Sequence, residues 1–255
     1  MKIVFTVDRV PDRAFEARFP VALESAAILP AGAPGDRRAS LRPGPQDAST
    51  HDRATLQSAL VIVVAAYLVG SVSFAVLVSR GFGLPDPHDY GSGNPGATNV
   101  LRTGNRKAAL LTLIGDGLKG FVAVWLAQVA AAALGAPAWT VPAAAVAVFL
   151  GHLYPVFHRF RGGKGVATGA GIVFALHWPL GLLLTLIWLV IAYGFKVSSI
   201  AGLVAALLMP IGMFYVQGPT LAAWAMVPIA VLLVWRHREN IKDLFRGSER
   251  RIGRG

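Results

Sequence analysis

Long apolar segments follow one another from residue 56 to residue 235, and they constrain the fold of this chain more than any other feature. Their bounds are 56–79, 108–134, 140–153, 165–177, 180–195, 200–216 and 220–235. A helix that crosses a bilayer needs about 20 predominantly apolar residues, so the short third and fourth segments also fit re-entrant helices. The pattern predicts an all-α, polytopic integral membrane helix bundle with about seven transmembrane helices.

The composition supports this fold class. Hydrophobic residues make up 55% of the 255 residues and charged residues only 15%, against about 25% charged in a typical soluble domain. The chain has no cysteine, which excludes disulfides and thiolate metal sites. The formal net charge is +11, but most basic residues after residue 55 lie between the apolar segments or after the last one. This placement favours membrane topology, anionic lipid and phosphate, and no nucleic-acid partner is expected.

Connections that carry Lys or Arg alternate with connections that carry neither. The basic ones are 80–107, 158–164, Lys196 and the tail after Trp235; the uncharged ones lie near Gly135, His177 and Gln217. Because cytoplasmic loops are enriched in Lys and Arg, this alternation predicts seven spans with the N-terminus outside and the C-terminus inside. All polar clusters described below then fall on the cytoplasmic side.

The first 55 residues differ in character from the rest. They are rich in Pro, Gly, Arg, Asp and Ala, and no apolar stretch in them is long enough for the hydrophobic region of a signal peptide. We expect residues 1–55 to be a disordered extension or the product of too early a start codon. Residues 56–255 then form the membrane domain with its basic cytoplasmic tail.

The first polar cluster spans Gly91–Asn99 and continues to Arg102. Its glycines allow backbone N–H groups to turn toward an anion, and Arg102 supplies a planar cation suited to phosphate oxygens. The candidate anion ligands in this cluster are Ser92, Gly93, Asn94, Gly96, Asn99 and Arg102. The alternative is an ordinary polar turn with an arginine at the membrane interface.

The second cluster is Gly162-Gly163-Lys164-Gly165, which precedes a helix predicted to start near Val166. A glycine loop that enters a helix N-terminus is a natural anion site, and Lys164 adds a mobile charge. The nucleotide-binding P-loop pattern is absent. Arg159 and Arg161 are also explained as topology signals, and His152 and His158 as interfacial polar residues.

The third cluster follows the last apolar segment. His237 and Asn240 are three residues apart and share a face if the helix continues. The histidine is a candidate general base, hydrogen-bond donor or bystander. Asp116 and Lys119, inside the second apolar segment, are interpreted as a mutually neutralising pair, because ionisable groups at that depth are usually paired. Ser198 is a weaker candidate that helix capping also explains.

Signatures of other chemistries are missing. The sequence contains no His-Glu-x-x-His helix and no Gly-x-Ser-x-Gly nucleophile motif. The histidines lack a convincing carboxylate partner for a metal, so neither a metal nor another cofactor is expected.

Three motifs, in order, resemble the acyl-phosphate-dependent glycerol-3-phosphate acyltransferases of the PlsY type. They are GSGNPGATNVLR (91–102), GHLYPVFHRFRGGKGVAT (151–168) and HRENIK (237–242). The resemblance covers about residues 56–253. It implies a seven-helix bacterial inner-membrane enzyme whose active site faces the cytoplasm. The implied reaction transfers an acyl chain from acyl phosphate to the 1-hydroxyl of sn-glycerol 3-phosphate, giving lysophosphatidic acid and phosphate.

The resemblance also assigns roles to residues. It implies catalytic roles for Ser92, Arg102, His237 and Asn240. It implies phosphate binding for the glycine loop with Lys164 and, less securely, for Ser198. Family members often carry arginine where this chain has His88, which weakens the expectation of a phosphate contact there.

An acyl phosphate is already activated, so positioning and charge stabilisation can supply much of the rate without a covalent enzyme intermediate. We therefore expect direct attack by the glycerol hydroxyl, with either His237 or a substrate phosphate oxygen as the base. Two alternatives stay open at this point: a transporter for a phosphorylated molecule and a non-catalytic lipid-binding protein. The sequence does not indicate an oligomeric state or an acyl-chain preference.

Overall fold

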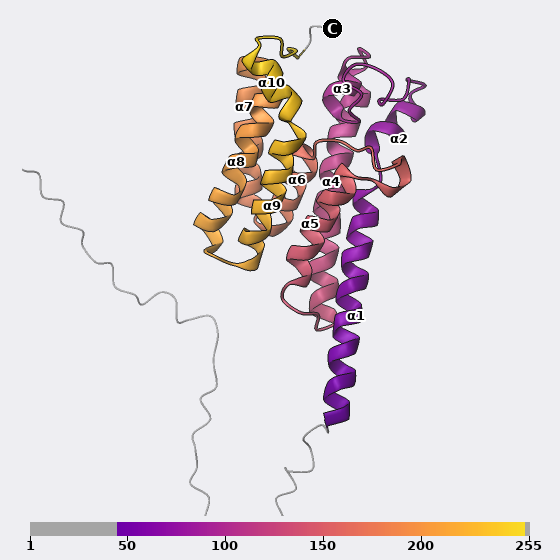
Figure 1. Ribbon diagram of the computed structural model, residues 1–255, viewed down its shortest axis with the longest axis vertical. Helices are drawn as coiled ribbons and strands as arrows, with labels where there is room; N and C mark the ends of the chain where they lie inside the picture. The colour runs from indigo at the N-terminus through magenta and orange to yellow at the C-terminus, as the bar shows by residue number, and fades with distance from the viewer. Residues whose placement is uncertain (1–44, 253–255) are drawn as a thin grey trace, which may run out of the picture. The chain divides into compact units, whose positions relative to one another are not determined.

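The computed structural model describes residues 45–252, and within that range all regular secondary structure is helical (Figure 1). The helices are α1 (Pro45–Gly70), α2 (Phe74–Gly81), α3 (Ala97–Leu101), α4 (Arg106–Ala133), α5 (Thr140–Leu153), the 3-10 turn η2 (Val156–His158), α6 (Val166–Leu176), α7 (Trp178–Phe195), α8 (Ser198–Gln217), α9 (Leu221–Arg236) and α10 (Arg238–Phe245). The predicted all-α membrane bundle is confirmed. Of the predicted N-terminal extension, residues 1–44 lie outside the described residues, whereas residues 45–55 belong to α1.

Within residues 45–252, five helices are long and apolar enough to cross a membrane: α1, α4, α5 with its following turn, α7 and α8. The helices α9 and α10, which meet at a 53° bend, pass the same test when they are taken together. The apolar helix α6 has only 11 residues, as its short apolar segment led us to expect. Large apolar side chains such as Val190, Tyr193 and Val231 are exposed on the outside of the bundle, where lipid replaces water as the solvent. The count of seven spans stays a prediction.

The first apolar segment, predicted as one continuous span, is broken between Gly70 and Phe74. Ser73 caps the new helix α2 by accepting a hydrogen bond from the backbone N–H of Val76. The break frees the carbonyl of Val72, and the Lys119 ammonium donates to it at 2.7 Å. A free carbonyl in an apolar interior costs several kcal/mol, which gives this lysine a structural purpose that hydropathy does not reveal.

Small residues let α4 and α6 approach closely. A Cβ on Gly171 would overlap the backbone of α4 at Gly117, and a Cβ on Gly120 would overlap the backbone of α6 at Thr168. Close backbone contact of this kind is the usual way in which helices associate within a bilayer, where the hydrophobic effect does not drive association. The same device joins α1 to α5 at Gly70 and Gly151.

The polar loops gather at one end of the bundle. Figure 1 shows α3 and α10 at this end, and the α4–α5 and α8–α9 turns at the other. The three predicted clusters lie in the loop before α3, in the loop between α5 and α6, and at the α9–α10 junction. The fold therefore brings together segments that are more than a hundred residues apart in the sequence.

Candidate active site

Asn99 organises the first cluster. Its side-chain oxygen accepts from the backbone N–H of Ser92 and from the Arg102 guanidinium, both at 3.0 Å. Its amide nitrogen donates to the carbonyls of Pro87 at 2.9 Å and Tyr90 at 3.1 Å. Both amide hydrogens are thus committed to the protein, so the buried Asn99 holds Ser92 and Arg102 side by side rather than offering an N–H to a ligand.

The loop around Asn99 needs its glycines. Gly91 and Gly93 have φ values of +61° and +63°, in the left-handed region that favours glycine. Asn94 and Gly96 complete the turn into α3, and within residues 45–252 no hydrogen bond joins the Asn94 side chain to the other clusters. Ser92 and Gly93 are exposed.

The glycine loop is held from behind. Arg236 donates to the carbonyl of Gly162 at 2.6 Å and to that of Gly163 at 3.1 Å. The backbone N–H of Gly163 donates to the backbone carbonyl of His152 at 3.2 Å, and a Cβ on Gly163 would overlap the His152 ring. Close packing against α5 therefore explains Gly162 and Gly163. Sequence reasoning did not select Arg236, which it counted among the topology charges.

The loop ends at the N-terminus of α6. Gly165 is the N-cap residue, with φ +88°, and no side chain caps the helix. The first N–H groups of a helix have no partner inside the helix, and with the helix dipole they favour an anion. Lys164 is next to this terminus, as the sequence predicted.

Lys164 connects the second cluster to the third. Its ammonium donates to the side-chain oxygen of Asn240. Burial lowers the pKa of Lys164 to about 8; the Glu249 carboxylate opposes this change and the nearby Arg102 adds to it. The lysine therefore carries a poorly solvated charge, which a bound phosphate would stabilise.

The α9–α10 junction sets the geometry of His237. The helix bends here, so His237 and Asn240 lie on either side of a 53° break and not on one continuous helical face. The Nδ1 nitrogen lies 2.8 Å from the carbonyl of Leu233. Because a carbonyl only accepts, Nδ1 carries the proton, and Nε2 of a neutral ring keeps its lone pair. Nε2 faces Gly202, where a Cβ would lie only 3.3 Å away.

Glu249 is a second residue that sequence reasoning missed. Its carboxylate accepts from Ser199 at 2.6 Å and from Asn240 at 2.8 Å, so the segment after α10 folds back onto the start of α8. Ser198 lies at the start of the same helix, and its hydroxyl accepts from Thr98 at 3.4 Å. The available signal was that Glu249 is the one acidic residue among residues 246–255.

These contacts connect the predicted clusters. The first and second are joined by His88, whose Nε2 lies 2.9 Å from the carbonyl of Arg161. The second and third are joined by Lys164 with Asn240 and by Arg236. Glu239 pairs at the surface with Lys242 at 3.1 Å.

The predicted ion pair inside α4 is present and has a third member. Asp116 lies 2.9 Å from Lys119 and 3.6 Å from His152. His152 is thus buried, and its interpretation as an interfacial residue was wrong. The histidine stands between the ion pair and Gly163, so the buried charges support the glycine loop.

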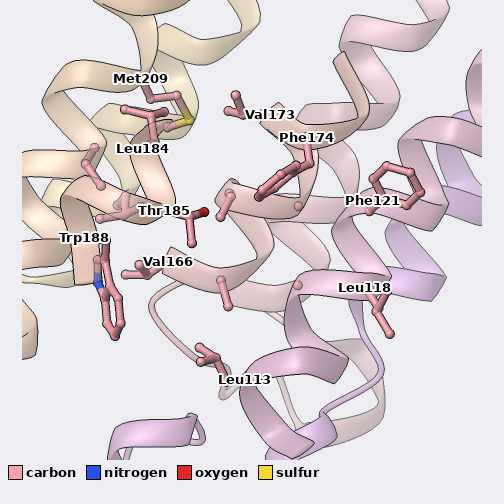
Figure 2. Close-up of a pocket in the computed structure, with 18 of the residues that line it drawn as sticks. Leu113, Leu118, Phe121, Val166, Val173, Phe174, Leu184, Thr185, Trp188 and Met209 are labelled. Carbon is pink, nitrogen blue, oxygen red and sulfur yellow. The ribbon is translucent and has the colours of Figure 1, made fainter. Parts of the chain in front are cut away.

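An apolar cavity of about 530 Å³ lies between α4, α6, α7 and α8. Figure 2 shows Val166, Thr185, Trp188 and Met209 around it. Val166 begins α6 beside Lys164, and Leu233, which also lines the cavity, binds His237. The cavity thus extends from the cationic end into the membrane-spanning part of the bundle.

An apolar helical bundle with a cationic, glycine-lined end defines an integral membrane protein with a candidate anion site. The family model described as "Glycerol-3-phosphate acyltransferase" matches residues 60–247. The chain belongs to the glycerol-3-phosphate acyltransferase family, whose members are integral membrane acyltransferases of phospholipid biosynthesis.

Individual relatives agree. The chain is 58% identical to a glycerol-3-phosphate acyltransferase of Cupriavidus pinatubonensis over 76% of this chain and 96% of the relative. It is 57% identical to a glycerol-3-phosphate acyltransferase of Burkholderia lata, over 76% of this chain and 91% of that relative. Among solved structures, it resembles PlsY (YgiH), an integral membrane glycerol 3-phosphate acyltransferase, in its glycerol 3-phosphate form. That match has 38% identity and a TM-score of 0.71 over 77% of this chain and 96% of that one. The lysophosphatidic acid form matches with a TM-score of 0.69.

Proposed function

We propose that this protein transfers an acyl chain from acyl phosphate to the 1-hydroxyl of sn-glycerol 3-phosphate, which releases lysophosphatidic acid and inorganic phosphate. Membership of the glycerol-3-phosphate acyltransferase family supports glycerol 3-phosphate as the acceptor of the acyl chain. The structural support is one observation: Lys164, with Arg102 nearby, directly precedes the N-terminus of α6, and Val166 at that terminus lines the apolar cavity. Such a site suits a donor that carries both a phosphate and a long hydrocarbon chain.

Each group has a proposed role. The acyl chain occupies the cavity, where its burial provides binding energy of about 0.8 kcal/mol for each CH₂. Arg102, Lys164 and the N–H groups at the start of α6 bind the two phosphates. The Ser92 hydroxyl, which donates to the Asn99 side-chain oxygen at 3.3 Å, turns its hydrogen to a substrate oxygen, and Asn240 keeps the lysine in place.

The chemical step is a direct attack without a covalent enzyme intermediate. The glycerol hydroxyl oxygen forms a bond to the acyl carbon, and the bond from that carbon to the phosphate oxygen breaks. Nε2 of His237 takes the hydroxyl proton, since Nδ1 already donates to Leu233. Phosphate leaves with the bonding electrons, and the cations stabilise the charge that develops on it.

A single assay tests the reaction. Purified protein receives glycerol 3-phosphate with either acyl phosphate or acyl-CoA, and lysophosphatidic acid is measured. We expect product with acyl phosphate only. Product with acyl-CoA alone would contradict the donor; absence of product, with uptake of glycerol 3-phosphate into vesicles, would instead identify a transporter.

The base and the covalent step have their own test. His237→Gln removes a base but keeps polar atoms at this position, and His237→Ala removes both. Near-complete activity in the Gln variant would exclude His237 as the obligatory base. An acyl group found on the protein after rapid quenching would contradict direct transfer.

We further propose that the protein is a multi-pass protein of the bacterial inner membrane, with seven spans, the N-terminus outside, and the active site and C-terminus in the cytoplasm. The absence of cysteine from the sequence makes this testable without a background. A single cysteine at Ser248 should be shielded from an impermeant thiol reagent in intact spheroplasts, and one at Gly135 should react. The reverse labelling pattern would invert the topology.

A further inference from the structure

His88, in the loop between α2 and α3, contacts two hydrogen-bond acceptors at once. Its Nδ1 lies 2.6 Å from the Asp86 carboxylate, and its Nε2 lies 2.9 Å from the carbonyl of Arg161 in the glycine loop. The ring is largely shielded, with 16% of the side chain exposed. It is the direct side-chain link, within residues 45–252, between the Ser92 loop and the glycine loop.

Protonation decides whether both contacts are hydrogen bonds. A neutral imidazole has one N–H, whereas a carboxylate and a backbone carbonyl can only accept. Both bonds therefore require the doubly protonated ring. We infer that His88, as an imidazolium, is a proton-dependent positioning residue that ties the Ser92 loop to the glycine loop and sets affinity for the glycerol 3-phosphate phosphate. The inference rests on the proposed function, since that function assigns phosphate binding to these loops.

The His88 link has a second anchor on each side. The carbonyl of Pro87, next to His88, accepts from Asn99, which also holds Ser92 and Arg102. Beyond Arg161, the next two carbonyls of the glycine loop are held by Arg236. Three successive backbone carbonyls thus accept hydrogen bonds from side chains: that of Arg161 from His88, and those of Gly162 and Gly163 from Arg236. Without the proton on Nε2, His88 no longer donates to the carbonyl of Arg161. Arg236 is then the remaining side-chain donor to these three carbonyls.

A second imidazole ring and several charged side chains lie near His88. His158 stacks against His88 with ring centroids 6.2 Å apart and an interplanar angle of 29°. Arg80 at the end of α2 and Lys119 in α4 add positive charge around His158, and Asp86 is the acid beside both rings. Two imidazolium rings face to face would repel each other. Of the two rings, it is His88 that contacts the Asp86 carboxylate directly.

The test compares the wild-type protein with His88→Arg, whose charge does not titrate, and His88→Asn, which is neutral. The KM for glycerol 3-phosphate and kcat are measured from pH 6 to pH 9 with saturating acyl phosphate. Ionisation of the substrate and of Lys164 is common to all variants, so it cancels in the ratio of wild-type KM to Arg-variant KM. We expect this ratio to rise about five- to tenfold with pH, the effect of one charge-assisted hydrogen bond, while kcat changes less than about twofold.

His177→Asn is the matched control, because His177 caps α7 through Leu180 in an uncharged turn and Asn can cap in its place. Its KM should follow the wild-type pH profile. The Asn variant at position 88 should have the high KM at all pH values. A wild-type to Arg-variant ratio that stays constant with pH, or an effect on kcat alone, overturns the inference.

A readout independent of activity separates this inference from the proposed function. The melting temperature of wild-type protein in detergent should fall relative to that of His88→Arg as pH rises, because the proton-dependent bond is lost only in the wild type. Parallel melting curves would refute the proton-dependent link even in active protein. Absence of lysophosphatidic acid with a pH-dependent melting difference would refute the proposed reaction and leave the link in place.

Discussion

The pKa of Lys164, lowered to about 8, predicts how the reaction depends on pH. A lysine with a lowered pKa is cationic below that value and loses its charge as pH rises through it. The pH profile of kcat/KM reports groups of the free enzyme. The cationic fraction is about 0.9 at pH 7, about 0.5 at pH 8 and about 0.1 at pH 9. If only the cation binds phosphate, kcat/KM for glycerol 3-phosphate should fall about tenfold from pH 7 to pH 9.

The assay divides the wild-type kcat/KM at each pH by that of Lys164→Ala, which has no titrating group at this position. Removal of one charge-assisted hydrogen bond should make this variant about 10–100-fold slower at pH 7. The ratio should decline as pH rises and approach one well above pH 8. Lys164→Arg, where it folds, should remove the decline because a guanidinium stays charged. A wild-type to Ala ratio that is constant from pH 7 to pH 9 would refute the assignment of Lys164 as the phosphate-binding cation.

Three further predictions address the support of the site. Arg236→Ala frees two carbonyls of the glycine loop and should lower kcat/KM about 100-fold, with partial recovery in Arg236→Lys, which keeps the charge but not the fork; full recovery in the Lys variant would contradict the bidentate role. Asp116→Ala leaves Lys119 buried without its carboxylate and should destabilise the bundle by about 3–5 kcal/mol in detergent unfolding; unchanged stability would contradict the structural role of the pair. Ala205→Trp fills part of the apolar cavity and should lower kcat/KM about tenfold for a long-chain acyl phosphate relative to a medium-chain one; an unchanged ratio would place the acyl chain elsewhere.

Much of the fold was predictable because a bilayer imposes one strong requirement. Apolar segments must become helices, since each backbone polar group needs a partner within its own segment. The predicted start and end of the second segment, 108–134, differ from those of α4 by only one or two residues. The prediction of one continuous helix over the first segment was wrong near Val72. There the Lys119 ammonium donates to the Val72 carbonyl in place of a helical backbone N–H. Hydropathy carries no information about such a contact.

Some residues of the candidate site were selected from the sequence, and others were not. Sequence reasoning selected Lys164, Asn240, Ser92 and Arg102 because chemically unusual residues beside apolar segments need a reason. In the structure Lys164 contacts Asn240, and Arg102 contacts Asn99, which also holds Ser92. Arg236 was missed because an arginine at a span end has a sufficient explanation in topology. Its actual contacts with Gly162 and Gly163 depend on the approach of α9 to the loop after α5, which pairs residues more than seventy positions apart.

The structure separates two kinds of polar residue that look alike in sequence. Asn99, Arg236 and His88 spend their hydrogen-bonding groups on backbone carbonyls of non-helical loops. These loops must leave helical geometry to form a concave anion site, and every carbonyl that loses its helical partner near an apolar interior needs another donor. By contrast, Lys164 carries a weakly solvated charge, and the start of α6 has no side-chain cap. A cationic site at the end of a membrane bundle thus requires more polar residues than its ligands contact, because most of them satisfy the loops that hold the few that bind.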